Sequence, residues 1–193
     1  MISYTKEEVK KNLLGSIEVA LFMPVARERF GNSFEEAMRS FLIPTLLLPV
    51  TLLFVFMFPK PELADASANT IAILYSLRMI ATWGLFLGSV YWLAKNVNRK
   101  DYFYQFVIAT NWLAIPATLA YVPAAWLLLS GAYSWQELYP FVVSLTVYTY
   151  AFTAFMAAYV LRVPWELAGF IAVISVMVDN YTSDLISFVS DKL

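Results

Sequence analysis

The chain has 193 residues, of which 61% are hydrophobic and only 14% are charged, and its formal net charge is −1. Soluble domains carry about 25% charged residues, so water cannot be the solvent for most of this surface. Near-neutral charge argues against nucleic acid as a partner, because phosphate binding needs a basic face. Cysteine and histidine are absent, which removes disulfides, imidazole metal sites and the Ser-His and Cys-His catalytic pairs. We therefore expect no enzyme, no cofactor and no metal.

The first 39 residues form a charged segment ahead of the long apolar stretches. Thr5 with Glu8, and Ser33 with Glu36, have the spacing of capping boxes and predict two helix starts. Residues 5–22 predict an amphipathic helix, because the apolar residues Val9, Leu13, Leu14, Ile17 and Leu21 recur at helical spacing. This helix lies in the membrane interface, or packs on the cytoplasmic ends of a helix bundle, or docks on a partner.

Five long apolar stretches follow, each near or above the roughly 20 residues that a helix needs to cross a ~30 Å hydrocarbon core. They cover residues 40–59, 70–94, 104–130, 140–161 and 167–189. The predicted fold class is all-α: a polytopic membrane protein whose transmembrane domain spans 40–193, preceded by a cytoplasmic amphipathic segment over 1–39. The short connection between the last two stretches predicts an antiparallel hairpin.

The distribution of lysine and arginine predicts the orientation, because basic residues close to the spans stay in the cytoplasm. With five crossings, only Lys60 and Lys192 fall on one side. The other side holds ten: Lys6, Lys10, Lys11, Arg27, Arg29, Arg39, Lys95, Arg99, Lys100 and Arg162. We expect a multi-pass protein of the cell membrane (the inner membrane of a bacterium), with a cytoplasmic N-terminus and an external C-terminus.

Three charged residues lie inside the apolar stretches, where each costs at least ~2.5 kcal/mol on insertion scales. At ~1.5 Å per residue, Arg78 lies roughly 6 Å outward of the midpoint of the second span. Asp179 lies near the midpoint of the fifth span and Asp184 roughly 9 Å outward. The matched depths predict an ion pair between the two helices. The alternative places Arg78 and the aspartates at the external interface.

Other polar residues suggest a cavity or helix contacts. Thr146, Thr149 and Thr153 share one face of the fourth span, and the third span contributes Gln105, Thr110 and Asn111. With Arg78, Asp179 and Asp184 they line a polar cavity, or they bond their own backbone and join helices. Pro116 and Pro123 predict a bent or broken third span.

Gly84 and Gly88 in the second span have the Gly-x-x-x-Gly spacing that lets another helix approach closely. Packing within the chain's own bundle is the first expectation for this pair. Self-association is the second.

Two short segments, Phe41-Leu-Ile-Pro44 and Asn111-Trp-Leu-Ala-Ile-Pro116, together with five closely spaced spans, resemble the Yip-domain family of membrane proteins over roughly residues 34–189. The Tyr-Gly-Pro-type motif that precedes the first span in eukaryotic members is absent. The resemblance implies a non-enzymatic protein that works through helix–helix and partner contacts.

Two functions follow from these patterns. The first is a membrane scaffold or accessory subunit that binds other membrane proteins, or itself, laterally within the lipid bilayer. The second is a small carrier or channel that handles an ion or polar solute through Arg78, Asn111, Asp179 and Asp184.

Overall fold

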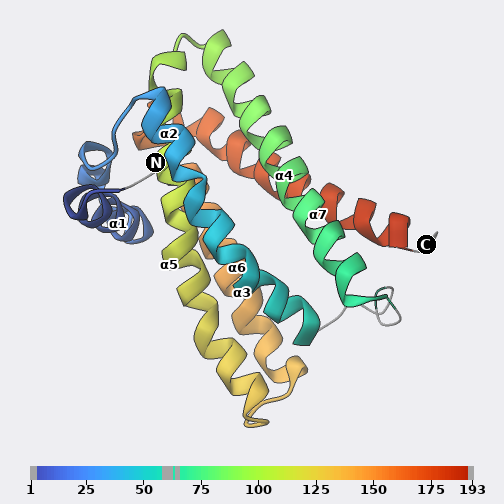
Figure 1. The fold of residues 1–193 in the computed structure, drawn as a ribbon. Helices are drawn as coiled ribbons and strands as arrows, with labels where there is room; N and C mark the ends of the chain where they lie inside the picture. The colour runs from blue at the N-terminus through green and yellow to red at the C-terminus, as the bar shows by residue number, and fades with distance from the viewer. Residues whose placement is uncertain (1–3, 58–62, 64–65, 191–193) are drawn as a thin grey trace.

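The computed structural model describes residues 4–57, 63 and 66–190, and this part of the chain is helical, without a strand. In the described residues, the 3₁₀ turns η1 (Pro24–Glu28) and η3 (Lys100–Tyr102) accompany the α-helices. The helices are α1 (Lys6–Ala20), α2 (Phe34–Ser40), α3 (Leu42–Met57), α4 (Ala68–Asn96), α5 (Phe103–Leu129), α6 (Trp135–Tyr159) and α7 (Trp165–Ser190). Figure 1 shows α3, α5 and α6 lying beside one another, while α4 runs at an angle to them and crosses α7.

Five segments are long and apolar enough to cross a membrane, as the hydropathy pattern predicts. They run over Phe34–Phe56, Ala68–Asn96, Lys100–Leu129, Trp135–Tyr159 and Trp165–Val189. Residues 58 and 59 of the predicted first span lie outside the described residues. The all-helical prediction is therefore confirmed, and the number of span-length helices agrees with the five expected.

The fourth long helix begins five residues earlier than predicted. Ser134 accepts a hydrogen bond from the backbone N–H of Glu137, and the Glu137 carboxylate accepts one from the backbone N–H of Ser134. This capping box satisfies backbone donors of the first turn. Pro140 therefore lies inside α6 rather than before it.

The third long helix, α5, is continuous through Pro116 and Pro123. The prediction of a broken helix at these prolines is therefore wrong.

The α6–α7 connection is a tight turn in which Arg162 adopts a left-handed conformation, with φ of 59°. The backbone N–H of Val163 reaches back to the carbonyl of Ala157 at 3.3 Å. The five residues 160–164 are then enough to reverse the chain, and α6 packs on α7. The predicted antiparallel hairpin is confirmed.

The basic connections meet at one end of the bundle. The Arg162 guanidinium carbon lies 4.0 Å from the centroid of the Tyr102 ring. Asn32 donates to the carbonyl of Asp101 at 2.7 Å and accepts from the backbone N–H of Gln105 at 3.0 Å. The α6–α7 turn, the α4–α5 connection and the N-terminal segment therefore share one end, as the charge pattern requires. Lys60 and Lys192 lie outside the described residues.

The first helix packs along the bundle rather than over its end (Figure 1). Near its start, the Tyr4 ring meets Trp112 of α5 at 5.5 Å. Beyond its end, Tyr148 of α6 donates to the carbonyl of Ala20 at 2.6 Å. Trp112 and Tyr148 lie about 13–17 Å along their helices from the end that holds the basic connections. The segment around α1 thus bridges α5 and α6 well inside their length.

Apart from Leu13, which packs against the core, the buried face of α1 is not its predicted apolar stripe. The buried residues are Gly15, Ser16, Glu18 and Val19. The predicted apolar residues are largely exposed instead: Val9 by 37%, Leu14 by 39%, Ile17 by 42% and Leu21 by 61%. A glycine is buried here because α1 lies close to the segment that follows it. A Cβ at Gly15 would lie 2.6 Å from the Cβ of Arg29. That the exposed stripe meets the membrane interface stays a prediction.

Candidate functional site

Two of the charged residues inside the apolar stretches, Arg78 and Asp179, form an ion pair. Arg78 of α4 donates from Nη2 to the Asp179 carboxylate of α7 at 2.7 Å, and to the Asp179 backbone carbonyl at 3.3 Å. The side chains are 21% and 49% exposed, respectively. One turn further along each helix, Thr82 and Thr182 bring their hydroxyl oxygens to 2.9 Å. The predicted pairing of α4 with α7 through Arg78 and Asp179 is present.

Two other predicted members lie elsewhere. Asp184 is exposed on α7, and no ion pair joins it to Arg78. Asn111 is 2% exposed and donates to the Ser40 hydroxyl at 2.8 Å, so it fixes α2 against α5. Asn111 lies seven residues before Thr118, the first α5 residue near Arg78, which is about 10 Å of helix. The four candidate residues therefore do not share one polar cavity.

Most of the hydroxyl and amide groups considered above form hydrogen bonds to backbone carbonyls, in their own helix or in a neighbouring segment. The Gln105 side chain donates to the carbonyls of Arg27 and Phe30. Thr110 bonds its own helix at Phe106, and Thr146 and Thr149 do the same at Val142 and Thr146. The donors of these side chains already have acceptors within the chain, which is the commoner role of such residues in apolar surroundings. Among the described residues, no three acidic side chains form a group able to hold a metal ion.

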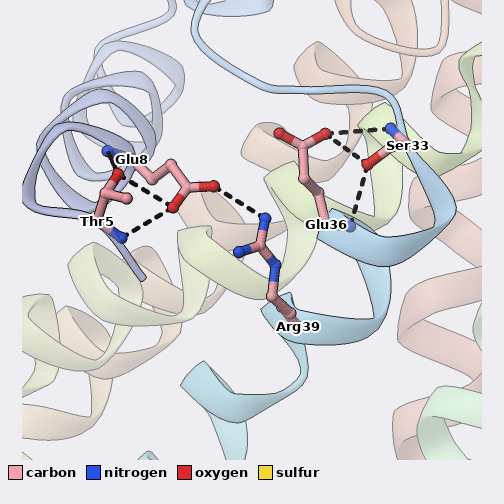
Figure 2. Close-up of polar contacts among 5 residues, drawn as sticks. All are labelled: Thr5, Glu8, Ser33, Glu36 and Arg39. Atoms are coloured by element: carbon pink, nitrogen blue, oxygen red, sulfur yellow. Dashed lines mark hydrogen bonds and ion pairs between the residues drawn. The ribbon is translucent and has the colours of Figure 1, made fainter. Parts of the chain in front are cut away.

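The two predicted capping boxes are present and lie side by side (Figure 2). In the first, the backbone N–H of Thr5 donates to the Glu8 carboxylate at 2.8 Å, and the backbone N–H of Glu8 donates to the Thr5 hydroxyl at 3.2 Å. The free side of the Glu8 carboxylate accepts from Arg39 of α2 at 2.8 Å. This contact and the Glu18–Arg29 pair at 2.9 Å were not predicted. The only sequence feature that draws attention to Arg39 is its position one turn after Glu36.

These contacts give Glu8 a measurable pH dependence. Hydrogen bonding from Thr5, first from its backbone N–H, lowers the pKa of Glu8 below its usual 4.5, and Arg39 adds to this. A lowered folded-state pKa stabilises the fold when the carboxylate is ionised, and that contribution is lost as pH falls below about 4.5. We expect Glu8→Gln to cost roughly 1 kcal/mol at pH 7 and progressively less towards pH 3. Thermal unfolding in mild detergent across this range measures the difference.

The matched control for that experiment is Glu7→Gln. Glu7 is exposed in the same helical turn, and neither capping box includes its side chain. A Glu8→Gln variant whose deficit stayed constant from pH 7 to pH 3 would contradict the assignment.

Gly84 and Gly88 face away from the bundle. A Cβ built on either glycine meets no atom within 4 Å, so the expectation that they pack against another helix of this chain is wrong for the described residues. They line an open groove of about 520 Å³ between α4 and α7. Leu85, Trp92, Phe170 and Ile174 form its apolar walls. Packing against another molecule stays a prediction.

No known protein-family model, curated protein or solved structure matches the chain. The class of protein is therefore defined by the helices themselves. Five helices long and apolar enough to cross a bilayer, joined by short connections, are the make-up of a multi-pass membrane protein.

Proposed function

We propose that this chain is a non-enzymatic integral membrane protein, a scaffold or accessory subunit that binds a membrane helix of another protein in the α4–α7 groove. The observation that carries the proposal is the unoccupied space over Gly84 and Gly88. Glycine inside a helix costs roughly 0.5–1 kcal/mol relative to alanine. In the described fold, no other atom lies within 4 Å of the space that the two glycines leave open.

The chemistry of the groove supports a helix as its occupant. Lipid tails are as apolar as leucine, so helices associate in a bilayer through close packing rather than through a hydrophobic driving force. Two glycines four residues apart let backbones approach closely. The groove walls are apolar except for the Ser89 hydroxyl, which already donates to the carbonyl of Leu85. This is also the kind of role that the resemblance to Yip-domain proteins implies.

We further propose that the end holding α1, α2 and the basic connections faces the cytoplasm, and that the C-terminus is external. The support is that Arg162 lies against Tyr102 and that the segment containing Arg27 is bonded to Gln105. One face of the bilayer thus receives the described basic connections. A membrane-impermeant thiol reagent on intact cells should label a cysteine added beyond residue 193 and spare one added before residue 1.

Enlarging the glycines tests the docking role. Gly84→Leu and Gly88→Leu place their Cβ atoms in open space and fill the groove from the α4 side, so the unfolding temperature should stay within a few degrees of the wild type. A stoichiometric partner that co-purifies with the wild type, and rebinds it once purified, should be lost. Loss follows because leucine side chains hold the backbones apart.

The control is Gly169→Leu on α7, where an added Cβ also meets no atom within 4 Å but which does not line the groove. This variant should retain the partner. The docking proposal fails if the Gly84 and Gly88 variants keep the same partner in the same ratio, or if Gly169→Leu loses it equally.

A further inference from the structure

A second concave site lies closer to the start of α4 than the glycine groove. It is a cavity of about 450 Å³ between α3, α4, α5 and α6, within the range of small-molecule sites. Its walls are mostly apolar and aromatic and include Phe54, Tyr75, Tyr121 and Trp135. Trp135 and Leu128 flank the α5–α6 loop, so the cavity extends towards that end of the bundle.

Among the described residues, Arg78 is the one charged residue that lines this cavity. Its partner Asp179 is not part of the cavity wall and lines a smaller neighbouring space of about 180 Å³. Both hydrogen bonds to Asp179 leave from Nη2. The Nε atom is buried and has no hydrogen-bond partner. A guanidinium carries five N–H donors, so Asp179 anchors Arg78 and leaves donors unused.

An unpaired buried donor is costly, by about 1–3 kcal/mol and more for a charged group. Native structures pair nearly all such donors with protein, water or ligand. The planar fork of arginine favours carboxylate and phosphate oxygens, because they accept two parallel hydrogen bonds. A cavity with one guanidinium and apolar walls fits a molecule with the same two parts: an anionic head and an apolar chain.

We propose that this cavity binds an anionic amphiphile, with the carboxylate or phosphate on Arg78 and the apolar chain along the aromatic wall. The site does not depend on the glycine groove, because the two share no lining residue. The same chemistry is offered by a free fatty acid and by the headgroup of an acidic phospholipid. Asp179 balances the arginine when the cavity is empty, so the pair also explains how a charge is kept at this depth.

Native mass spectrometry of the purified, delipidated full chain tests the proposal. The probes are palmitic acid, phosphatidylglycerol, and two molecules without net negative charge, methyl palmitate and phosphatidylcholine. Wild-type protein should retain one anionic probe in preference to its matched neutral or zwitterionic counterpart. Retention of palmitic acid alone identifies a fatty-acid site, and retention of phosphatidylglycerol alone identifies a lipid-headgroup site.

Two variants locate the binding. Arg78→Gln with Asp179→Asn removes both charges and leaves no unpaired carboxylate, so retention of the anionic probe should fall at least about tenfold, the loss of one charge-assisted hydrogen bond. Thr118→Phe fills the cavity and leaves the ion pair intact, and it should also reduce retention. Asp184→Asn is the control, because Asp184 lies on the same helix as Asp179 but lines neither space.

Three results would overturn the proposal. Equal retention of charged and uncharged probes by the wild type overturns the proposal. So does unchanged retention of the anionic probe in a folded double variant. If the double variant does not fold, unchanged retention in the Thr118→Phe variant overturns it instead.

Discussion

Arg78→Gln should destabilise the protein far more than the loss of a surface ion pair would. The substitution leaves the Asp179 carboxylate without the guanidinium that now lies 2.7 Å away. In water, such an exposed pair contributes about 0–1 kcal/mol. At membrane depth, an unpaired aspartate costs at least ~2.5 kcal/mol on insertion scales. The expected loss is therefore about 2–3 kcal/mol, measured as a lowered unfolding midpoint in lipid bicelles.

The neutral double variant, Arg78→Gln with Asp179→Asn, should recover most of this loss, because it removes the unpaired charge along with its partner. The reversed pair, Arg78→Asp with Asp179→Arg, should recover part of it. A loss below about 1 kcal/mol for Arg78→Gln would place the pair at an aqueous surface. Single variants that are both as mild as Asp184→Asn would lead to the same conclusion.

Gly15→Ala should be far more harmful than Gly84→Ala or Gly88→Ala, although alanine is the better helix former in all three positions. The new Cβ would lie 2.6 Å from the Cβ of Arg29 and 2.8 Å from the tip of the Phe30 ring. Arg29 is itself held by Glu18, whose side chain is only 8% exposed. The backbone must shift to relieve this contact, so we expect a loss of about 1–3 kcal/mol.

Gly84→Ala and Gly88→Ala are the matched controls for that measurement. Both lie inside a helix with open space around them, so each should leave stability unchanged or raise it by roughly 0.5–1 kcal/mol. Thermal unfolding of the three variants side by side gives the comparison. A Gly15→Ala variant as stable as the other two would show that α1 does not pack closely on the 29–30 segment.

The parts of the fold that follow from length and hydropathy could be predicted from the sequence. A helix that must cross ~30 Å of hydrocarbon needs a fixed number of apolar residues, so the five long helices were visible directly. The Arg78–Asp179 pair was also accessible, because helical rise converts sequence position into depth. The start of α6 was missed, although Ser134 and Glu137 carry the same capping signal that was used at Thr5 and Ser33.

Contacts chosen by packing could not be predicted in this way. Asn111 was expected in a polar cavity, but its partner Ser40 lies 71 residues earlier, and nothing in local periodicity connects them. The buried face of α1 could not be predicted for a related reason. Periodicity finds the most apolar face, whereas α1 buries Gly15 and Ser16, and Gly15 lies close against residues 29–30. The apolar stripe is left for other surroundings.

The hydrogen bond from Tyr148 to Ala20 joins residues 128 positions apart in the chain. Ribosomes add roughly 5–20 residues per second. Tyr148 is therefore synthesised roughly 6–26 s after Ala20, the residue at the end of α1 to which it donates. During that interval the end of α1 lacks its hydrogen bond to α6. The amino-terminal segment therefore completes its assembly after most of the later helices have been delivered to the bilayer.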